Sequence, residues 1–325
     1  MVTWVGSQVG DYLIDMQLGE GNFSWVYRGI HEDSGHYSAF KVAKPTGTAF
    51  SEGQAIAAMP TKAVATITGG IMEVTPRASM LLQKQHEQLA QHNLPGLIQV
   101  KHFVDKPELT YLEMEYISGP TLRELMEKGP VSIDKMIEVA RCLDKLSKTR
   151  KFAYHGDLKP ENIMFSQSGA VVIDPGFFGK LELENGSTMS QCAVTTPAYY
   201  PMLEPDDVLA FGLLLWEVVM GEQPLNKNTS SDASELTRVG PQLLELVQLQ
   251  EAVGRYLLSP ILDIQRPSIR YPNIDRNVEN LLLKGLRLHH LGQGIEVDPG
   301  FRSFAAISGA LATLRLKGKE QFLDQ

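Results

Sequence analysis

The sequence has few cysteines and no long uninterrupted apolar run. Only Cys142 and Cys192 occur among 325 residues, which predicts no disulfide framework and fits a reducing compartment, the cytoplasm. The longest apolar stretch, Val208–Met220, is interrupted by Glu217. It is also shorter than the roughly 20 residues that a membrane-spanning helix needs. The sequence therefore predicts no membrane segment.

Basic residues are also fewer than acidic ones. The chain has 30 Lys and Arg against 38 Asp and Glu, for a net charge of −8. This balance argues against a general surface for nucleic acid or anionic membranes. Residues 1–4, Met-Val-Thr-Trp, lack the basic start of a signal peptide. With 43% hydrophobic and 21% charged residues the composition is globular, and the length predicts two lobes or domains.

Residues 154–165 read Tyr-His-Gly-Asp-Leu-Lys-Pro-Glu-Asn-Ile-Met-Phe and concentrate polar groups. Asp157, Lys159 and Asn162 place a carboxylate, an ammonium group and a carboxamide within six positions. Pro160 lies between them, which favours a loop over a helix interior. An acid in a loop can take a proton from an incoming hydroxyl group.

A second acid follows at the end of a predicted strand. The apolar run Ala170–Ile173 indicates a buried strand, and Asp174 comes directly after it. A carboxylate and an amide oxygen, here Asp174 and Asn162, are ligands that suit Mg²⁺. Together, the two stretches strongly resemble the catalytic loop and metal-binding motif of protein kinases, with Asp-Pro-Gly at 174–176 in place of Asp-Phe-Gly.

The N-terminal stretch carries a glycine-rich turn followed by a lysine. Gly19 and Gly21 allow backbone N–H groups to approach phosphates closely. Lys41 follows in an alternating strand, as the phosphate-binding lysine of kinases does, and Ser24 replaces the third glycine of their loop. The resemblance implies these ATP-binding residues: Leu18, Gly19, Glu20, Gly21, Asn22, Phe23, Ser24, Val26, Ala39, Lys41, Met114, Glu115, Ile117 and Asn162.

The same resemblance implies a role for each catalytic residue. Asp157 would be the base that orients the acceptor hydroxyl group, and Lys159 would neutralise the transferred phosphoryl group. Lys41 would hold the α- and β-phosphates of ATP, and Asn162 and Asp174 would hold Mg²⁺. The implied reaction is transfer of the γ-phosphoryl group to a serine or threonine hydroxyl of a protein substrate.

The implied fold is α+β, the two-lobed protein kinase fold, over the whole chain. A small β-rich N-lobe is expected over residues 1–116 and a larger, mainly helical C-lobe over 117–325. Residues 45–75 exceed a minimal kinase and are predicted to be an insertion. Within it, residues 64–74 read as a β-hairpin with a turn at Gly69-Gly70.

The helix after the insertion departs from the kinase pattern at one position. It is predicted to open at Thr75-Pro76, and kinases carry a glutamate on it that pairs with the lysine. Here that position is Gln85, while Glu87 faces the other side. We expect Gln85 to face Lys41 with a neutral hydrogen bond only, so that Gln85→Glu leaves activity unchanged or raises it.

Several C-lobe stretches also resemble kinase motifs. Asp174–Glu204 is predicted to be the activation segment, with Thr196 as the hydroxyl group that contacts the catalytic aspartate and lysine. Asp207–Glu217 resembles the buried helix at the centre of the C-lobe. Arg302, in a late Asp-Pro-x-x-Arg motif, is expected to form an ion pair with Glu204.

The residue before the catalytic aspartate is Gly156, where many kinases have an arginine that binds a phosphorylated activation segment. Glycine supplies no charge, so packing is expected to order the segment without phosphorylation. The alternative is that another basic residue, such as Lys180, binds the phosphate. Four aromatic residues are predicted to provide that packing: Phe177, Phe178, Tyr199 and Tyr200.

Two other functions stay open. His155-Gly156-Asp157 is also a signature of aminoglycoside- and choline-kinase-like enzymes, which phosphorylate small molecules. Lys159, the glycine loop and the Thr196 region favour the protein kinases instead. Gln85 leaves room for a pseudokinase, a binding scaffold without turnover. Neither the protein substrate nor the oligomeric state follows from the sequence.

Overall fold

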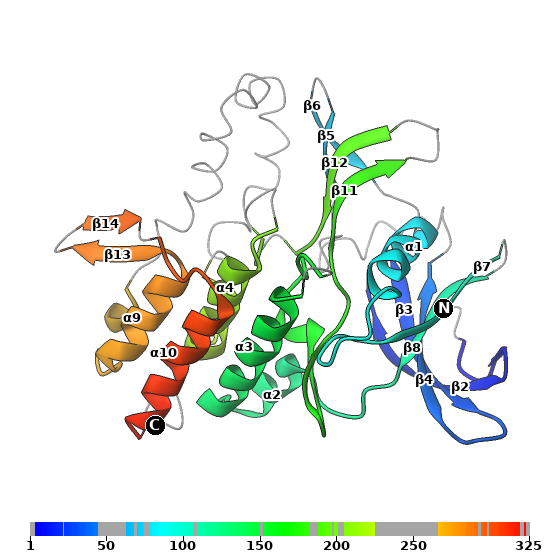
Figure 1. Cartoon of the computed structure of the whole chain (residues 1–325), viewed down its shortest axis with the longest axis horizontal. Coiled ribbons are helices and arrows are strands. Elements are labelled where there is room, and N and C mark those ends of the chain that lie inside the picture. Colours follow the sequence, from blue (N-terminus) through cyan, green and yellow to red (C-terminus); the bar gives the residue numbers. More distant parts are fainter. Residues whose placement is uncertain are drawn as a thin grey trace.

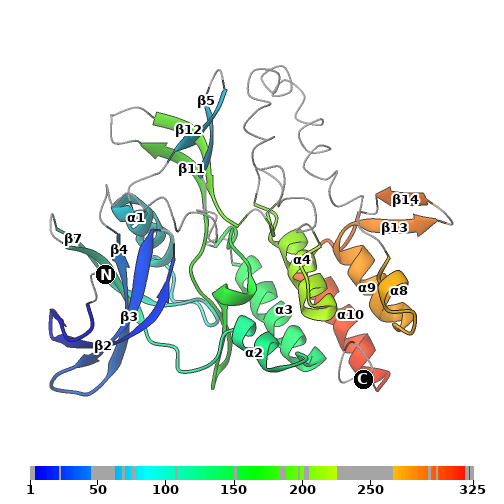
Figure 2. The same ribbon diagram turned by 180° about the vertical axis from the view of Figure 1, so that it is seen from behind.

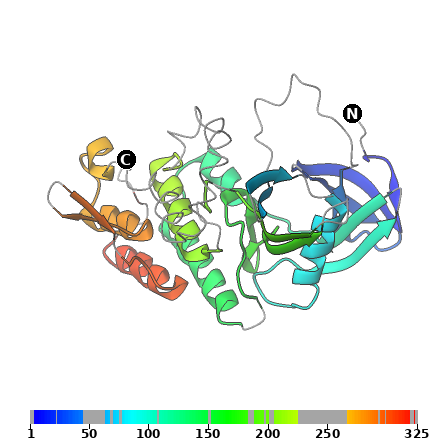
Figure 3. The same ribbon diagram turned by 90° about the horizontal axis from the view of Figure 1, so that it is seen from above.

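The computed structural model describes most of the chain. The described residues are 4–21, 23–44, 63–67, 70–74, 78–106, 109–149, 152–182, 188–196, 198–200, 205–224, 266–291, 294–297, 299–318 and 322. Figure 1 shows a β-rich part at one end and a helical part at the other. Seen from above, in Figure 3, the two parts again lie at opposite ends of the molecule. This arrangement agrees with the predicted α+β, two-lobed fold.

The β-rich part contains a six-stranded antiparallel sheet in the spatial order β1-β2-β3-β4-β8-β7. Its strands are β1 (Gln8–Val9), β2 (Tyr12–Glu20), β3 (Ser24–His31), β4 (Tyr37–Ala43), β7 (Val100–Lys106) and β8 (Leu109–Glu115). The turn between β2 and β3 is the glycine-rich stretch, and Lys41 lies in β4 opposite Val26 of β3. The register thus brings the predicted loop and lysine to neighbouring strands.

Helix α1 (Ala78–Leu89) packs against this sheet, on strands β4, β7 and β8. Its buried face is the predicted one: Ala78, Leu81, Leu82 and Leu89. Thr75 and Pro76, where the helix was expected to open, lie outside the described residues. Glu87 is exposed and pairs with Lys84, as expected for the side of the helix away from the site.

The predicted hairpin in the insertion is present as β5 (Ala63–Ile67) and β6 (Gly70–Val74). Its register pairs Ile67 with Gly70, so Gly70 belongs to a strand and not, as predicted, to the turn. The hairpin also pairs with the predicted activation segment, a pairing that the sequence did not predict. A four-stranded sheet runs β11-β12-β5-β6 (Figure 1; Figure 2 shows β11, β12 and β5 from behind), with β11 (Phe177–Glu182) and β12 (Thr188–Val194) from that segment.

The helical part contains two further short β-hairpins and most of the buried core. Its elements are α2 (Leu122–Lys128), α3 (Ile133–Ser147), a 3₁₀ turn (Pro160–Asn162), β9 (Ile163–Ser166), β10 (Gly169–Val172), α4 (Asp207–Met220), α8 (Pro267–Arg270), α9 (Arg276–Gly285), β13 (Leu288–Leu291), β14 (Gly294–Val297) and α10 (Phe304–Leu316). Helix α3 packs along α10, and α4 packs along α9. The buried hairpin β9–β10 holds the predicted catalytic loop against this core.

Local sequence signals explain where the first helices begin. Thr121 and Glu124 form a capping box on α2, because each side chain accepts from the other residue's backbone N–H. Ser132 caps α3 by accepting from the Lys135 N–H. Gly129, between the two helices, has a φ of 147°, which favours glycine. These caps define the two helices that lead into the predicted catalytic loop.

Helices α4 and α9 approach closely enough to require glycine at Gly212. A Cβ atom there would lie 2.2 Å from the carbonyl oxygen of Gly285. We expect Gly212→Ala to lower the free energy of unfolding by about 1–3 kcal/mol, the usual cost of overpacking. The matched control is Gly309→Ala in α10, where nothing lies within 4 Å of the added Cβ. It should raise the free energy of unfolding by about 0.5–1 kcal/mol. Equal changes for the two variants in denaturant unfolding would refute the close packing of α4 on α9.

The predicted ion pair of the C-lobe meets the structure only in part. Glu204 lies outside the described residues, so its ion pair with Arg302 stays a prediction; Arg302 itself is exposed. Nearby, Arg287 forms an ion pair with Asp206, the residue that caps α4. In the described stretches of the chain, none of the helices combines the length and apolar character that crossing a membrane requires.

Candidate active site

A cavity of about 280 Å³ lies where the glycine-rich turn, helix α1 and the catalytic loop meet. Its lining residues are Glu20, Gly21, Phe23, Ser24, Lys41, Leu81, Leu82, Gln85, Asp157, Lys159, Asp174, Pro175, Gly176, Phe177 and Thr195. Eight of the predicted site residues are thus brought together, although they come from segments more than 100 positions apart.

Other predicted nucleotide-binding residues do not line this cavity. Glu115 and Ile117 line a second cavity of about 500 Å³ beside residues 93–97 and 166–168. Asn22 lies outside the described residues. Leu18, Gly19, Val26, Ala39, Met114 and Asn162 line neither cavity. The adenine-binding part of the site therefore stays a prediction.

The carboxylate of Asp157 receives hydrogen bonds from three directions. Its Oδ1 accepts from the backbone N–H of Thr196 at 2.8 Å. Its Oδ2 accepts from Asn162 Nδ2 at 3.0 Å and lies 3.0 Å from Lys159 Nζ. Asp157 is buried. The carboxylate is therefore held at a fixed position between the catalytic loop and the activation segment.

Lys159 and Thr196 meet as predicted, with one difference. Lys159 Nζ donates to Thr196 Oγ1 at 3.1 Å, whereas the contact with Asp157 is made by the Thr196 backbone. Burial by itself would lower the pKa of Lys159, but the carboxylates of Asp157 and Asp174 raise it above its ordinary value. The side chain is thus a stable cation next to the predicted base.

The start of α4 anchors the catalytic loop. Asp207 accepts from the backbone N–H groups of His155 at 2.6 Å and Gly156 at 2.9 Å. It also accepts from the Tyr200 hydroxyl at 2.7 Å, and Tyr200 in turn accepts from the Leu158 N–H. Burial, and then the Asp207 carboxylate, raise the pKa of Tyr200 well above its ordinary value, so that the hydroxyl stays protonated.

The His155 side chain is fully buried behind the same loop. Its Nδ1 accepts from the Asp157 N–H, so its Nε2 carries the proton and donates to the Ile173 carbonyl at 2.9 Å. Burial lowers the pKa of His155, which favours this neutral form. The imidazole therefore links this loop to Ile173, which follows β10 and directly precedes Asp174.

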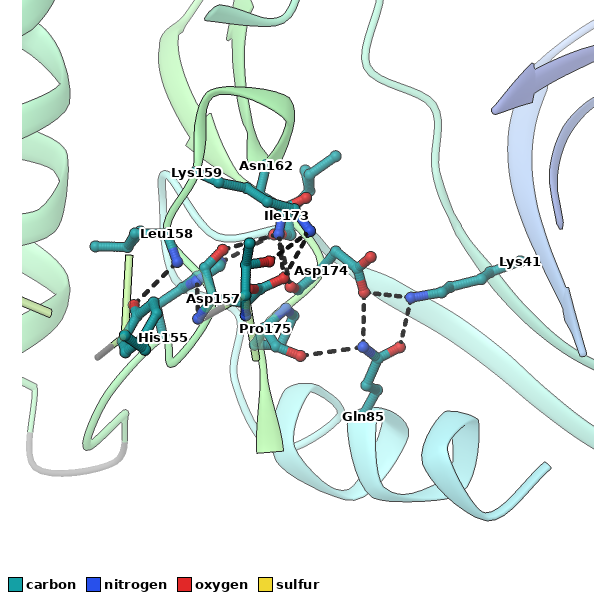
Figure 4. Close-up of polar contacts among 12 residues, drawn as sticks. Lys41, Gln85, His155, Asp157, Leu158, Lys159, Asn162, Ile173, Asp174 and Pro175 are labelled. Carbon is teal, nitrogen blue, oxygen red and sulfur yellow. Dashed lines mark hydrogen bonds and ion pairs between the residues drawn. The ribbon is translucent and has the colours of Figure 1, made fainter. Parts of the chain in front are cut away.

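Lys41, Gln85 and Asp174 form a closed group at the other side of the cavity (Figure 4). Gln85 Oε1 accepts from Lys41 Nζ at 2.9 Å, which confirms that Gln85 faces Lys41. Gln85 Nε2 also donates to Asp174 Oδ1 at 2.6 Å, and Lys41 forms an ion pair with the same oxygen. Partial removal from water would raise the pKa of Asp174, but the Lys41 ammonium group lowers it below the ordinary value.

The donor set at Asn162 and Asp174 suits a divalent cation such as Mg²⁺. Asn162 uses its Nδ2 to donate to Asp157 and to the backbone carbonyl of Asp174, which leaves its amide oxygen as a ligand. The Asp174 side chain is 39% exposed. A hard carboxylate oxygen and an amide oxygen are typical Mg²⁺ ligands, so these residues fit the ion.

Gly156 lies against aromatic residues of the predicted activation segment. Gly156 has a φ of +80°, and a Cβ atom there would lie 3.0 Å from the Phe178 ring. Phe178 packs against Tyr154 and Tyr200, at ring distances of 5.5 and 6.1 Å. Tyr199 donates to the buried Glu217 of α4. An arginine at position 156 would meet both an unfavourable backbone and an occupied space.

Sequence reasoning missed three contributors to the site. Thr195 is buried and lines the cavity, and no group in the described structure bonds its hydroxyl. Asp207 was recognised as the start of a helix but not as the acceptor for the catalytic loop. Its only signal was an acid before an apolar helix, which a cap explains equally well. The pairing of β12 with β5 left no signal in the sequence that we recognised.

Comparison with known families agrees with this geometry. A family model described as the protein kinase domain matches residues 73–253, more than half of the chain. The serine/threonine-protein kinase PkaA of Streptomyces coelicolor is 26% identical over 323 residues, which cover 94% of this chain and 54% of PkaA. PknB of Mycolicibacterium smegmatis is 34% identical over 131 residues, 36% of this chain and 21% of PknB. This chain thus spans about half or less of these relatives.

Solved structures are similar over nearly the whole chain. The apo form of PpkA-294 aligns with a TM-score of 0.57 and 17% identity, covering 94% of this chain and 98% of that one. The PknI kinase domain of Mycobacterium tuberculosis aligns with a TM-score of 0.55 and 15% identity, covering 96% and 99%. At such identities the likeness concerns the fold alone.

Proposed function

The chain belongs to the protein kinase family and has its two-lobed fold, and on that premise we propose that it transfers the γ-phosphoryl group of ATP to serine or threonine hydroxyls of proteins. The observation that carries the proposal is the contact between Asp157, Lys159 and Thr196. A carboxylate and an ammonium group in contact at the cavity, 3.0 Å apart, suit an acceptor hydroxyl and a phosphoryl group that meet beside them.

The proposed mechanism divides the site into two halves. Asp157 orients the acceptor hydroxyl and takes its proton, while Lys159 neutralises charge on the phosphoryl group. Lys41 holds the nucleotide phosphates beneath the turn formed by Glu20 to Ser24. Asn162 and Asp174 would hold Mg²⁺, which supplies charge neutralisation on the phosphate oxygens when bound.

The direct test is incubation with labelled ATP and Mg²⁺, with a generic basic protein as acceptor, followed by phosphoamino-acid analysis. Label on serine or threonine is the expected result. Label on a small-molecule acceptor and on no protein would favour an aminoglycoside- or choline-kinase-like activity. Nucleotide binding without transfer to any acceptor would favour a scaffold and overturn the proposal.

We also expect activity to be independent of phosphorylation in the activation segment. Gly156 offers no cation to a phosphate, while the β11–β12 hairpin pairs with β5 and packs through Phe178 and Tyr200. The order of the segment thus comes from backbone pairing and aromatic contacts. Initial rates should change by less than about threefold after phosphatase treatment, which corresponds to under 1 kcal/mol in the barrier.

A second measurement separates this idea from anchoring by another base such as Lys180, which lies in β11. Ser187, Thr188 and Ser190 are changed together to alanine. Thr195 is left intact because it lines the cavity. A fall of tenfold or more, about 1.4 kcal/mol, in both experiments would mean that a phosphate orders the segment after all.

A further inference from the structure

Gln85 joins two side chains that the proposed function assigns to different ligands. Lys41 comes from β4 and Asp174 follows β10, and the carboxamide of Gln85 on α1 bonds to both of them. The same carboxamide donates to the Pro175 carbonyl at 3.0 Å, which fixes its orientation. Figure 4 shows the three side chains pointing toward one another at the edge of the site.

This triangle depends on the chemistry of glutamine. A carboxamide accepts from an ammonium group with its oxygen and donates to a carboxylate with its nitrogen. A glutamate at position 85 would compete for Lys41 and could not donate to Asp174. It would place a second carboxylate beside that of Asp174, and like charges at this distance repel. The neutral residue therefore leaves Asp174 as the one acidic partner of Lys41 within the described residues.

The backbone gives an independent sign that Asp174 is held in place. Its φ is +56°, in the left-handed region that residues other than glycine rarely adopt. Bonds from Lys41 and Gln85 converge on its Oδ1, so they favour this conformation over relaxed ones. Lys41 is nearly buried, with 11% of its side chain exposed. Removing its acidic partner without a replacement would leave an uncompensated charge.

We propose that Gln85 is a positioning residue that keeps Lys41 and Asp174 paired with each other until a divalent cation and nucleotide phosphates replace both partners together. The inference rests on the proposed function, because it takes Lys41 as a phosphate contact and Asp174 as a metal contact. A cation that binds alone would take Asp174 from Lys41 and leave the ammonium group without phosphate as its new partner. Phosphate that binds alone would take Lys41 from Asp174 and leave the carboxylate without metal as its new partner. Metal and nucleotide must therefore bind with strong mutual dependence.

The test measures ADP binding by calorimetry as Mg²⁺ is varied, so that it does not depend on catalysis. The wild type is compared with Gln85→Glu, Gln85→Leu and the control Gln83→Glu. Gln83 is exposed on the same helix and bonds to Glu87, so the control adds the same charge away from the site. The melting temperature of each variant confirms that it is folded.

We expect the Mg²⁺ concentration for half-maximal ADP binding to fall about tenfold in Gln85→Glu, the effect of losing one hydrogen bond to a charged group. Gln85→Leu should show a smaller fall, because it removes the donor to Asp174 without adding a charge. Gln83→Glu should stay within about twofold of the wild type.

An unchanged or higher Mg²⁺ requirement in Gln85→Leu would overturn the inference, since a fall in Gln85→Glu alone would reflect only its added charge. If Gln85→Glu does not fold, Gln85→Leu decides the question by itself. Phosphoryl transfer is assayed separately on the wild type. Absence of transfer with this binding pattern intact would overturn the proposed function but not the role of Gln85.

Discussion

Asp157→Asn should lower the rate of phosphoryl transfer by about 10²–10⁴-fold, the range for loss of a general base. Asparagine has the same shape, but its carboxamide cannot accept the acceptor's proton. In the wild type, Lys159 and the Thr196 N–H donate to the Asp157 carboxylate. In the variant, the N–H₂ group of the carboxamide would point toward one of these two donors. Binding of Mg-ADP should change by less than about threefold, under 1 kcal/mol, because Asp157 serves the acceptor.

The matched control for this substitution is Asp105→Asn, an exposed aspartate on β7 that accepts from Thr110. It should leave both transfer and binding unchanged. Steady-state rates with a protein acceptor and calorimetry with Mg-ADP provide the two measurements. If Asp157→Asn retained more than about a tenth of the wild-type rate, loss of a base would not describe it, and another group would have to take the proton.

The parts of the site that the sequence predicted are those defined by short stretches. Asp157, Lys159 and Asn162 lie within six residues, so a single loop conformation fixes their relations. The α1 face could be predicted because helical spacing of leucines sets its register. Gln85 could be placed opposite Lys41 by counting back from the nearby stretch Leu94–Ile98. In each case the information is local and periodic.

What could not be predicted depends on contacts between distant segments. The pairing of Cys192 with Ala65 joins strands 127 residues apart, and neither strand identifies its partner, because many strands share alternating or apolar patterns. The second hydrogen bond of Gln85 was missed for the same reason. The sequence suggested an acceptor for Lys41, but only the fold places Asp174 beside the amide nitrogen.

This donor bond also revises the expected effect of Gln85→Glu on catalysis. The sequence suggested that activity would be unchanged or higher, because a glutamate would strengthen the bond to Lys41. The structure shows a competing loss, since the glutamate cannot donate to Asp174 or to the Pro175 carbonyl. Two bonds are lost where one is strengthened, so the metal requirement reports this substitution more directly than the rate does.

Asp207→Ala should destabilise the protein and lower transfer together, because one carboxylate holds the catalytic loop. It removes the acceptor of the His155 and Gly156 N–H groups and of the Tyr200 hydroxyl. Each buried donor left without a partner costs about 1–3 kcal/mol. We therefore expect the free energy of unfolding to fall by about 3 kcal/mol or more, measured by denaturant titration.

Graded variants test whether the loss comes from these bonds. Asp207→Asn keeps one acceptor oxygen and should lose less stability than Asp207→Ala, while Tyr200→Phe removes the acceptor of the Leu158 N–H and should cost about 1–3 kcal/mol. Asp144→Ala on α3, which breaks a surface ion pair with Lys148 just after the helix, is the control and should cost less than about 1 kcal/mol. A loss for Asp207→Ala no larger than that of the control would contradict the anchoring role, because the loop would then hold its shape without the carboxylate.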